Sequence, residues 1–127
     1  MANVKKYRVD YDGGVAGITV EIDHDIMTEP ALHEINNFWL DAEYRLANAK
    51  GDILMAVLVF LAQTSLIVQL EGDYNINGLI KRFDYDDPYL SGGIEGWPKM
   101  DGSAGIKIVR LDQHVFYHND FNVKEVA

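Results

Sequence analysis

The sequence predicts an α+β domain in which a small antiparallel sheet packs against two long helices and one short helix. Three observations lead to this prediction. Two segments near the N-terminus alternate apolar and polar residues as strands do, a later segment has the period of a helix, and a third is apolar over 18 residues. With 127 residues, 48% of them hydrophobic, the chain is long enough for one domain with its own core and too short for two.

The first 23 residues are expected to form a β-hairpin. Apolar residues alternate with polar ones in both halves, as Tyr7, Val9 and Tyr11 and then as Ile18, Val20 and Ile22. Between them, residues 12–14 read Asp-Gly-Gly and tolerate the positive φ angles of a tight turn. The hairpin should therefore have one apolar and one solvated face.

A helix is expected to follow from residue 28 to residue 49. Thr28 is a natural N-cap, and Pro30 fits the first turn, where its missing N–H costs little. Six apolar residues at spacings of 3 and 4 would form one continuous stripe, namely Leu32, Ile35, Trp39, Ala42, Leu46 and Ala49. Gly51 would end this helix, and Asp52 would cap the next.

The second expected helix, residues 53–70, carries no charge and is apolar nearly all round. Its length is at the lower limit for crossing a membrane. It contains four polar residues, however, and acidic residues flank it instead of Lys or Arg, so we interpret it as part of a soluble domain. Such a helix in so small a chain needs cover on several sides, which predicts either a central helix or the seam of a homodimer.

The remainder of the chain is predicted to complete the sheet. A short helix is expected over residues 77–83, and residues 84–105, with five glycines and two prolines, should form a long loop. Residues 106–111 then read as a central strand, and residues 114–118 as a further short strand. His114 and His118 are four apart, but on a strand they would lie about 13 Å from each other, too far to share one zinc ion.

Composition excludes several classes of function. The net charge of −9 argues against direct binding to nucleic-acid phosphates or to anionic membranes, since both need a cationic surface. The chain has no cysteine, which excludes disulfides, thiolate metal sites and cysteine nucleophiles. No apolar signal segment follows the N-terminal basic residues, so a cytoplasmic location is expected.

The distribution of charge predicts a surface for a basic protein partner. Residues 10–73 hold twelve acids and two bases, so we expect the carboxylates to gather over one exterior region. Acids and aromatics that could attract and then anchor a partner are Asp41, Asp84, Tyr85, Asp86, Asp87, Tyr89 and Trp97. The alternative is an ordinary acidic surface with Trp97 folded back onto the core.

A calcium loop is a second hypothesis. Residues 73–84 match the spacing of an EF-hand loop, with Asp73, Asn75, Asn77 and Asp84 as the oxygen ligands and Gly78 at the sixth position. Asp84 is shorter than the usual Glu, and Lys81 places a cation beside the ion. The alternative is a turn in which Asn75 or Asn77 caps the short helix, with no cofactor bound.

A small enzyme is the third hypothesis. His24 lies between Asp23 and Asp25 and could form a proton-transfer pair with a carboxylate, although solvated histidines beside acids also arise without function. The sequence contains no phosphate-binding glycine loop, dinucleotide fingerprint or serine nucleophile motif. An enzymatic activity is therefore not the favoured interpretation.

Three segments, 23–25, 32–39 and 95–106, resemble an uncharacterised family of short bacterial proteins associated with phages and prophages, a domain of unknown function. The resemblance extends over nearly the whole chain and implies a bacterial cytoplasm and a mobile-element gene. It supplies no catalytic residues. Together with the charge map it favours a small acidic interaction protein that binds a basic surface of a host protein, acting as a nucleic-acid mimic or an antagonist of host defence.

Overall fold

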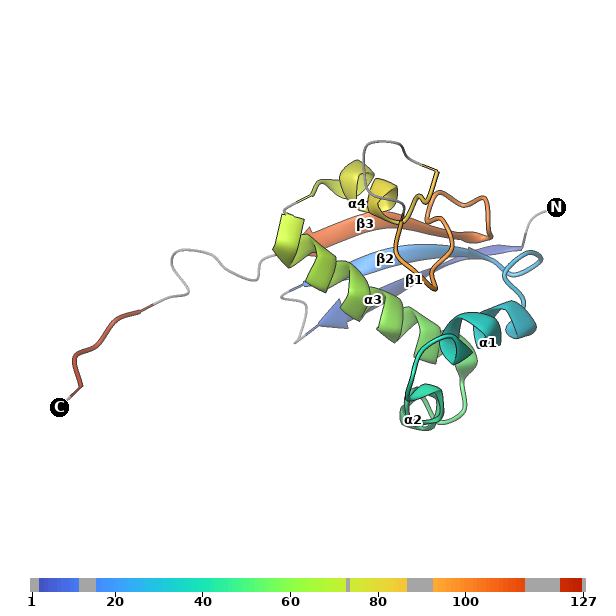
Figure 1. The fold of residues 1–127 in the computed structure, drawn as a ribbon, viewed down its shortest axis with the longest axis horizontal. Coiled ribbons are helices and arrows are strands. Elements are labelled where there is room, and N and C mark those ends of the chain that lie inside the picture. The colour runs from blue at the N-terminus through green and yellow to red at the C-terminus, as the bar shows by residue number, and fades with distance from the viewer. Residues whose placement is uncertain (1–2, 12–15, 73, 87–92, 114–121, 127) are drawn as a thin grey trace.

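The protein is an α+β domain with a three-stranded antiparallel sheet and four helices in the part of the chain that the structure describes (Figure 1). A computed structural model describes residues 3–11, 16–72, 74–86, 93–113 and 122–126. The strands are β1 (Val4–Tyr11), β2 (Ala16–Asp23) and β3 (Ile106–Gln113), and the helices are α1 (Glu29–Asn37), α2 (Ala42–Asn48), α3 (Ile53–Gly72) and α4 (Ile76–Arg82). The predicted fold class is confirmed.

The sheet has the order β1-β2-β3, so the central strand is β2, and the prediction that residues 106–111 form a central strand is wrong. β1 and β2 form the predicted hairpin, with Val4 opposite Asp23 and Tyr11 opposite Ala16. The apolar residues of β2 and β3 alternate as expected, and those facing the helices are fully buried, namely Ala16, Ile18, Val20, Ile22, Ile106 and Ile108. The register between β2 and β3 shifts at Thr19 and Val20. Most of β1 is exposed, as befits an edge strand.

The expected single helix over residues 28–49 is wrong. The chain leaves the helix after Asn37, and Asp41 adopts φ 67° before α2 begins. Aspartate is among the few side chains that tolerate this left-handed conformation. The break turns α2 away from α1, so that both helices pack on α3 instead of continuing as one rod of about 30 Å.

The helix ends agree better with the sequence. Thr28 stands at the N-cap of α1 with Pro30 in its first turn, although the Thr28 side chain makes no capping hydrogen bond. After α2, Gly51 has φ 83° and its N–H donates to Leu46 O at 2.9 Å. Asp52 caps α3, because its Oδ1 accepts the N–H of Met55 at 3.2 Å.

The core lies between the sheet and α3, which crosses one face of the sheet (Figure 1). One side of α3 is buried against the strands through residues such as Val57, Leu61 and Val68. The second half of the predicted long loop closes the core, because Trp97 and Met100 are buried within it. Ile108 N–H donates to Met100 O at 3.2 Å, which ties this loop to β3. The predicted strand at residues 114–118 lies outside the described residues.

Candidate interaction surfaces

In the predicted docking cluster near residue 85, the charge of the acidic side chains is partly neutralised by Lys99. Lys99 Nζ lies 2.6 Å from Asp86 Oδ2 and 3.6 Å from Asp84 Oδ1, and 5.1 Å from the centre of the Tyr85 ring. The hydrogen bond with Asp86 raises the pKa of Lys99, so the ammonium remains charged beside the two carboxylates. This cluster therefore offers a partner less negative charge than its sequence suggests.

Trp97 is not on the surface, and its predicted role as an exposed anchor is wrong. Its side chain is 4% exposed. The ring centre lies 5.2 Å from that of Phe60 on α3 and 6.4 Å from that of Phe83, so the indole closes the core between two elements. The alternative, with Trp97 folded onto the core, is confirmed. Asp87 and Tyr89 lie outside the described residues.

A different group of carboxylates lacks compensation. We define the acidic end by the seven acids of residues 23–52, which are Asp23, Asp25, Glu29, Glu34, Asp41, Glu43 and Asp52. None of them forms an ion pair with any residue that the structure describes, and all but Asp23 are exposed. They belong to the end of β2 and the loop after it, to α1 and α2 with the turn before α2, and to the turn before α3, which lie together at one end of the molecule (Figure 1).

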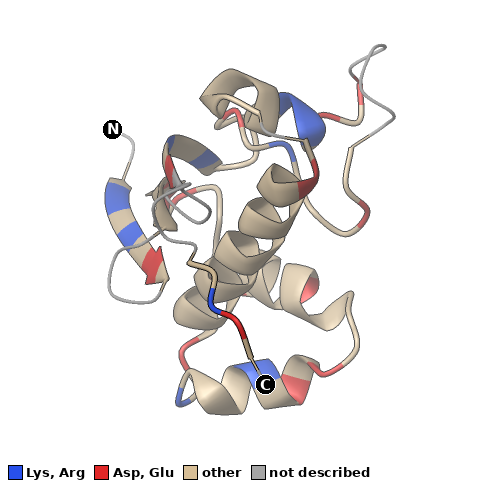
Figure 2. Cartoon of the chain, turned by 90° about the vertical axis from the view of Figure 1, so that its left-hand side faces the viewer, with Lys and Arg blue, Asp and Glu red and all other residues tan. Residues whose placement is uncertain are grey.

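Other acids are spread over the molecule, as Figure 2 shows. The prediction that the carboxylates gather over one exterior region is therefore wrong. Five of the others, Asp10, Glu21, Asp84, Asp86 and Asp112, are paired with a Lys or Arg. The acidic end differs because only Arg45 and Lys50 lie within its segment.

Arg45, one of these two cations, is directed inward. Its guanidinium donates to Leu40 O at 2.6 Å, to Asn36 O at 2.7 Å and to Asn36 Oδ1 at 2.8 Å. Its Cζ lies 4.3 Å from the centre of the Phe60 ring, where the cation stacks on the aromatic face. The guanidinium thus satisfies carbonyls at the break between α1 and α2. Sequence reasoning missed this role, since no local motif links Arg45 to Asn36.

His24 is bonded to a tyrosine. Tyr7 Oη and His24 Nε2 are 2.7 Å apart, and the two rings meet edge to face. Asp23 uses one carboxylate oxygen to accept the N–H of Asp25, at 3.0 Å. His24 also borders a surface hollow of about 370 Å³ with Glu29 and Asp52, but no hydrogen bond joins it to a carboxylate among the described residues. The proton-transfer pair of the enzyme hypothesis is thus not preformed here.

Two of the four predicted calcium ligands, Asn75 and Asn77, belong to the start of the helix α4. Asn75 is its N-cap, and Asn75 Oδ1 accepts the N–H of Gly78 at 2.8 Å, as the alternative interpretation predicted. Asn77 lies within the helix, and Asp84 is near Lys99. Asp73 lies outside the described residues. Among the residues described, no group of three His, Asp or Glu side chains is arranged to hold a metal ion.

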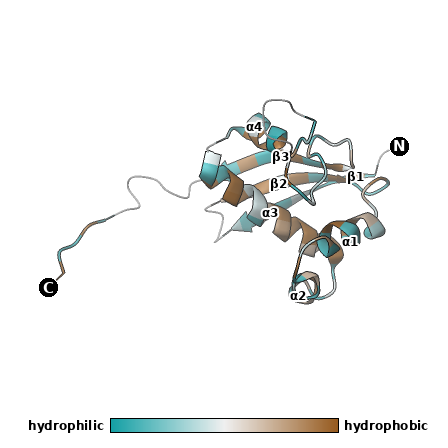
Figure 3. Ribbon diagram, viewed as in Figure 1, coloured by the Kyte–Doolittle hydropathy of each residue, from teal (hydrophilic) through white to brown (hydrophobic). Residues whose placement is uncertain are grey.

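One face of α3 is left uncovered by the residues that the structure describes. Met55, Val59, Ile67 and Leu70 are each about half exposed, between 49% and 57%, and they recur at helical spacing with Gln63 between them. We call these five residues the outer face of α3. Figure 3 shows that apolar residues run along most of this helix. The predicted central helix is therefore buried on one side only.

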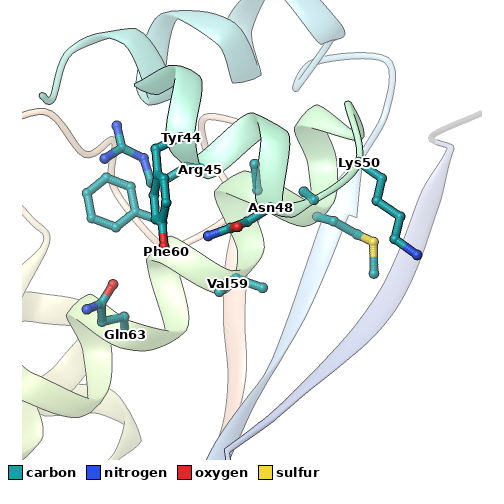
Figure 4. A pocket seen from close by; sticks show the side chains of 10 residues that line it. Tyr44, Arg45, Asn48, Lys50, Val59, Phe60 and Gln63 are labelled. Carbon is teal, nitrogen blue, oxygen red and sulfur yellow. The ribbon is translucent and has the colours of Figure 1, made fainter. Parts of the chain in front are cut away.

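Two hollows adjoin the outer face and share Val59 and Gln63. The first, of about 430 Å³, lies between α2 and the N-terminal half of α3, with Arg45 and Phe60 at one end and Lys50 at the other (Figure 4). The second, of about 670 Å³, lies between residues 9–11 of β1 and the C-terminal half of α3. Together they form a mainly apolar groove along the helix.

The length and composition of α3 would allow it to cross a membrane. An 18-residue window has a mean hydropathy of 2.2, and half of that window is buried within the chain. Core helices of globular proteins meet the same criteria, so this observation alone is weak evidence for a span.

The chain is similar to two curated proteins. It is 50% identical over 125 residues to protein ea10 of Escherichia phage lambda and to lambda prophage-derived protein ea10 of Escherichia coli O6:H1, and the alignments cover 98% of each chain. No solved structure matches it significantly. Residues 17–123 match the family described as protein of unknown function (DUF2528). The chain therefore belongs to this family of unknown function, whose members include phage and prophage proteins.

Proposed function

We propose that the chain is a phage- or prophage-encoded interaction protein that acts in the bacterial cytoplasm by docking its acidic end against a basic surface of a host protein. A nucleic-acid-binding channel would suit it, because such a channel presents cations to phosphate groups. The proposal depends on one observation, that seven neighbouring carboxylates have no ion pair among the described residues.

Electrostatics explains why unpaired carboxylates favour such a role. A carboxylate already bonded to a cation must give up that partner before it can bind another, whereas an unpaired one loses only its hydration. The inward direction of Arg45 further reduces compensation at this end, because its donors are used by main-chain carbonyls. Lys50 then remains as the outward cation of the segment.

The test is affinity capture from an extract of the host bacterium with the full chain immobilised. Because the contact is between charges at an exposed surface, capture should weaken at least about tenfold between roughly 50 and 300 mM salt. The double variant Glu34→Gln/Glu43→Gln should lose most of the captured protein at low salt.

A matched control distinguishes binding by the acidic end from binding that depends only on the net charge of the chain. The variant Glu95→Gln/Glu125→Gln removes the same charge from exposed positions outside the acidic end. It should capture as well as the unmodified chain. Equal loss in both double variants, or capture that is independent of salt, would contradict the proposal.

A further inference from the structure

We propose that the outer face of α3 binds a second copy of this chain, with the two α3 helices antiparallel about a twofold axis near residues 62 and 63. This inference does not depend on the acidic end. It begins from the half-exposed Met55, Val59, Ile67 and Leu70, which form an apolar strip, interrupted at Gln63, of the kind that isolated chains seldom expose.

The order of side chains along α3 suits a twofold axis. In an antiparallel pair centred between residues 62 and 63, Met55 of one chain lies opposite Leu70 of its partner, and Val59 lies opposite Leu66. Met55, Val59 and Leu70 thus each lie opposite an apolar side chain of the partner, as a self-complementary interface requires, whereas Ile67 lies opposite Leu58, which is buried in its own chain. Gln63 lies at the centre, where two amides related by symmetry can donate and accept reciprocally, and such a polar pair fixes the register of packed helices.

The groove is also complementary in shape under this symmetry. α2 stands beside the N-terminal half of α3, and the larger hollow of about 670 Å³ lies beside the C-terminal half. α2 and the end of β1, which border the two hollows, lie on the same side of α3 (Figure 1). The twofold operation therefore brings α2 of each copy, with its exposed Tyr44, toward the hollow of the other.

Charges at the two ends of the groove are opposite in sign. Lys50 borders the first hollow, and Glu71 lies one helical turn after Ile67 on the same side of α3. Both are exposed, and neither has an ion-pair partner among the residues described. Antiparallel packing brings Lys50 of one copy to the end of the helix that carries Glu71 of the other. This complementarity selects a second copy over an unrelated apolar partner.

Sedimentation equilibrium of the full chain tests the association. At micromolar concentration the mass should be twice the 14.3 kDa of one chain. Val59→Asp should give a monomer with an unchanged circular dichroism spectrum, since Val59 is exposed in the single chain. Leu40→Asp, at a position that is 89% exposed and off the helix, should stay dimeric. A wild-type chain that is monomeric at all concentrations would overturn the proposal.

The ion pair gives a second test. Glu71→Lys and Lys50→Glu should each weaken dimerisation several-fold, and the double variant Lys50→Glu/Glu71→Lys should restore it. If the double variant is as weak as the sum of the single changes, Lys50 and Glu71 do not face each other and the antiparallel register is wrong.

Single cysteines test the geometry directly, because the chain contains no other cysteine. Gln63→Cys should form an intermolecular disulfide under mild oxidation. Met55→Cys should not, because two copies of residue 55 lie about 22 Å apart in this arrangement, but it should link to Leu70→Cys in a mixture of the two variants. Linkage of Met55→Cys to itself would indicate a parallel pair and contradict the proposal. These results are independent of the Glu34 and Glu43 variants, so either proposal can fail alone.

Discussion

Arg45 holds together the segment in which the helix breaks. Its guanidinium donates to the carbonyls of Asn36 and Leu40 and packs on Phe60, so one side chain supports both the end of α1 and the contact of α2 with α3. Lysine has neither the planar fork nor the number of donors to replace it.

We therefore expect Arg45→Ala to lower the free energy of unfolding by about 2–3 kcal/mol, because it leaves half-buried carbonyls without a charged donor. Arg45→Lys should recover less than half of this loss. Urea denaturation checks both values. Arg110→Ala is the matched control, since the Arg110 side chain is 70% exposed and bonds only to Asp112 among the described residues, and it should cost less than about 0.5 kcal/mol. Equal effects at the two arginines would show that the contacts of Arg45 add no stability.

Asp101 and Ser103 provide a test by pH. The hydroxyl and the N–H of Ser103 donate to Asp101 Oδ1 at 2.6 and 2.9 Å, and these bonds hold the pKa of Asp101 below its ordinary 3.8. Because the pKa is lower in the folded state, the ionised carboxylate stabilises the fold above pH 3.8, and this stability is lost as the pH falls through the folded-state pKa.

Ser103→Ala should bring the pKa of Asp101 back toward 3.8 and lower the Tm at neutral pH. The free-energy change should stay below about 1 kcal/mol, since the carboxylate is exposed. The difference in Tm between the two chains should be constant near pH 7 and shrink below pH 3.8. In an Asp101→Asn background, which cannot titrate, the effect of Ser103→Ala should not change with pH. A gap of unchanged size down to about pH 2 in the native background would contradict this account.

Among the elements, the loop that carries Trp97 is the least regular and yet closes the core. Trp97 lies between Phe60 of α3 and Phe83, which follows α4, so its indole joins two helical regions. Trp97→Ala should lower the free energy of unfolding by about 3–5 kcal/mol, as for other large buried aromatics. Phe38→Ala, at a position that is 52% exposed, should cost less than about 1 kcal/mol. Denaturation followed by circular dichroism measures both. A cost below about 1 kcal/mol for Trp97 would mean that the loop does not pack as described.

The sequence predicted elements best where local signals and tertiary packing agree. The hairpin, α3, α4 and β3 lie close to where periodicity and caps place them, and β2 and the start of β3 bury the apolar residues that alternate along them. The break at Asp41 could not be predicted in this way. The apolar stripe continues through it, and the contact that spans the break joins Arg45 to Asn36, nine residues apart in the sequence. The burial of Trp97 was likewise undecided, because only the position of α3 provides the ring that covers it.

The candidate surfaces, too, could be predicted only where they depend on local sequence and not on packing between distant segments. The acidity of residues 23–52 can be counted from the sequence, but the compensation of Asp84 and Asp86 by Lys99 depends on a loop that returns in space. Because residues 53–70 are apolar nearly all round, the sequence indicated that this helix needs to be covered by other elements or by another copy. Which side of α3 is exposed depends on how the sheet and the other helices pack against it, and the sequence alone does not give this packing.

For the molecule as a whole, the two proposed surfaces are compatible. The acidic end and the contact between copies share α2 and the turn that holds Lys50, but α1 and the loop after β2 lie away from the twofold axis, which passes near the middle of α3. An antiparallel dimer would therefore carry its two acidic ends at opposite extremes and could engage two basic sites at once, which raises the apparent affinity when both are within reach.

β1 has a further consequence for how copies of the chain meet. It is an edge strand with largely exposed side chains, and it carries Lys5, Lys6 and Arg8, of which Lys6 pairs with Glu21 and Arg8 with Asp10 and Asp112. Pairing of two such strands would remove water from these charged side chains, so extension of the sheet from one molecule to the next is disfavoured. The distribution of lysine and arginine thus protects the protein against fibre-like growth at the border where its backbone is most open.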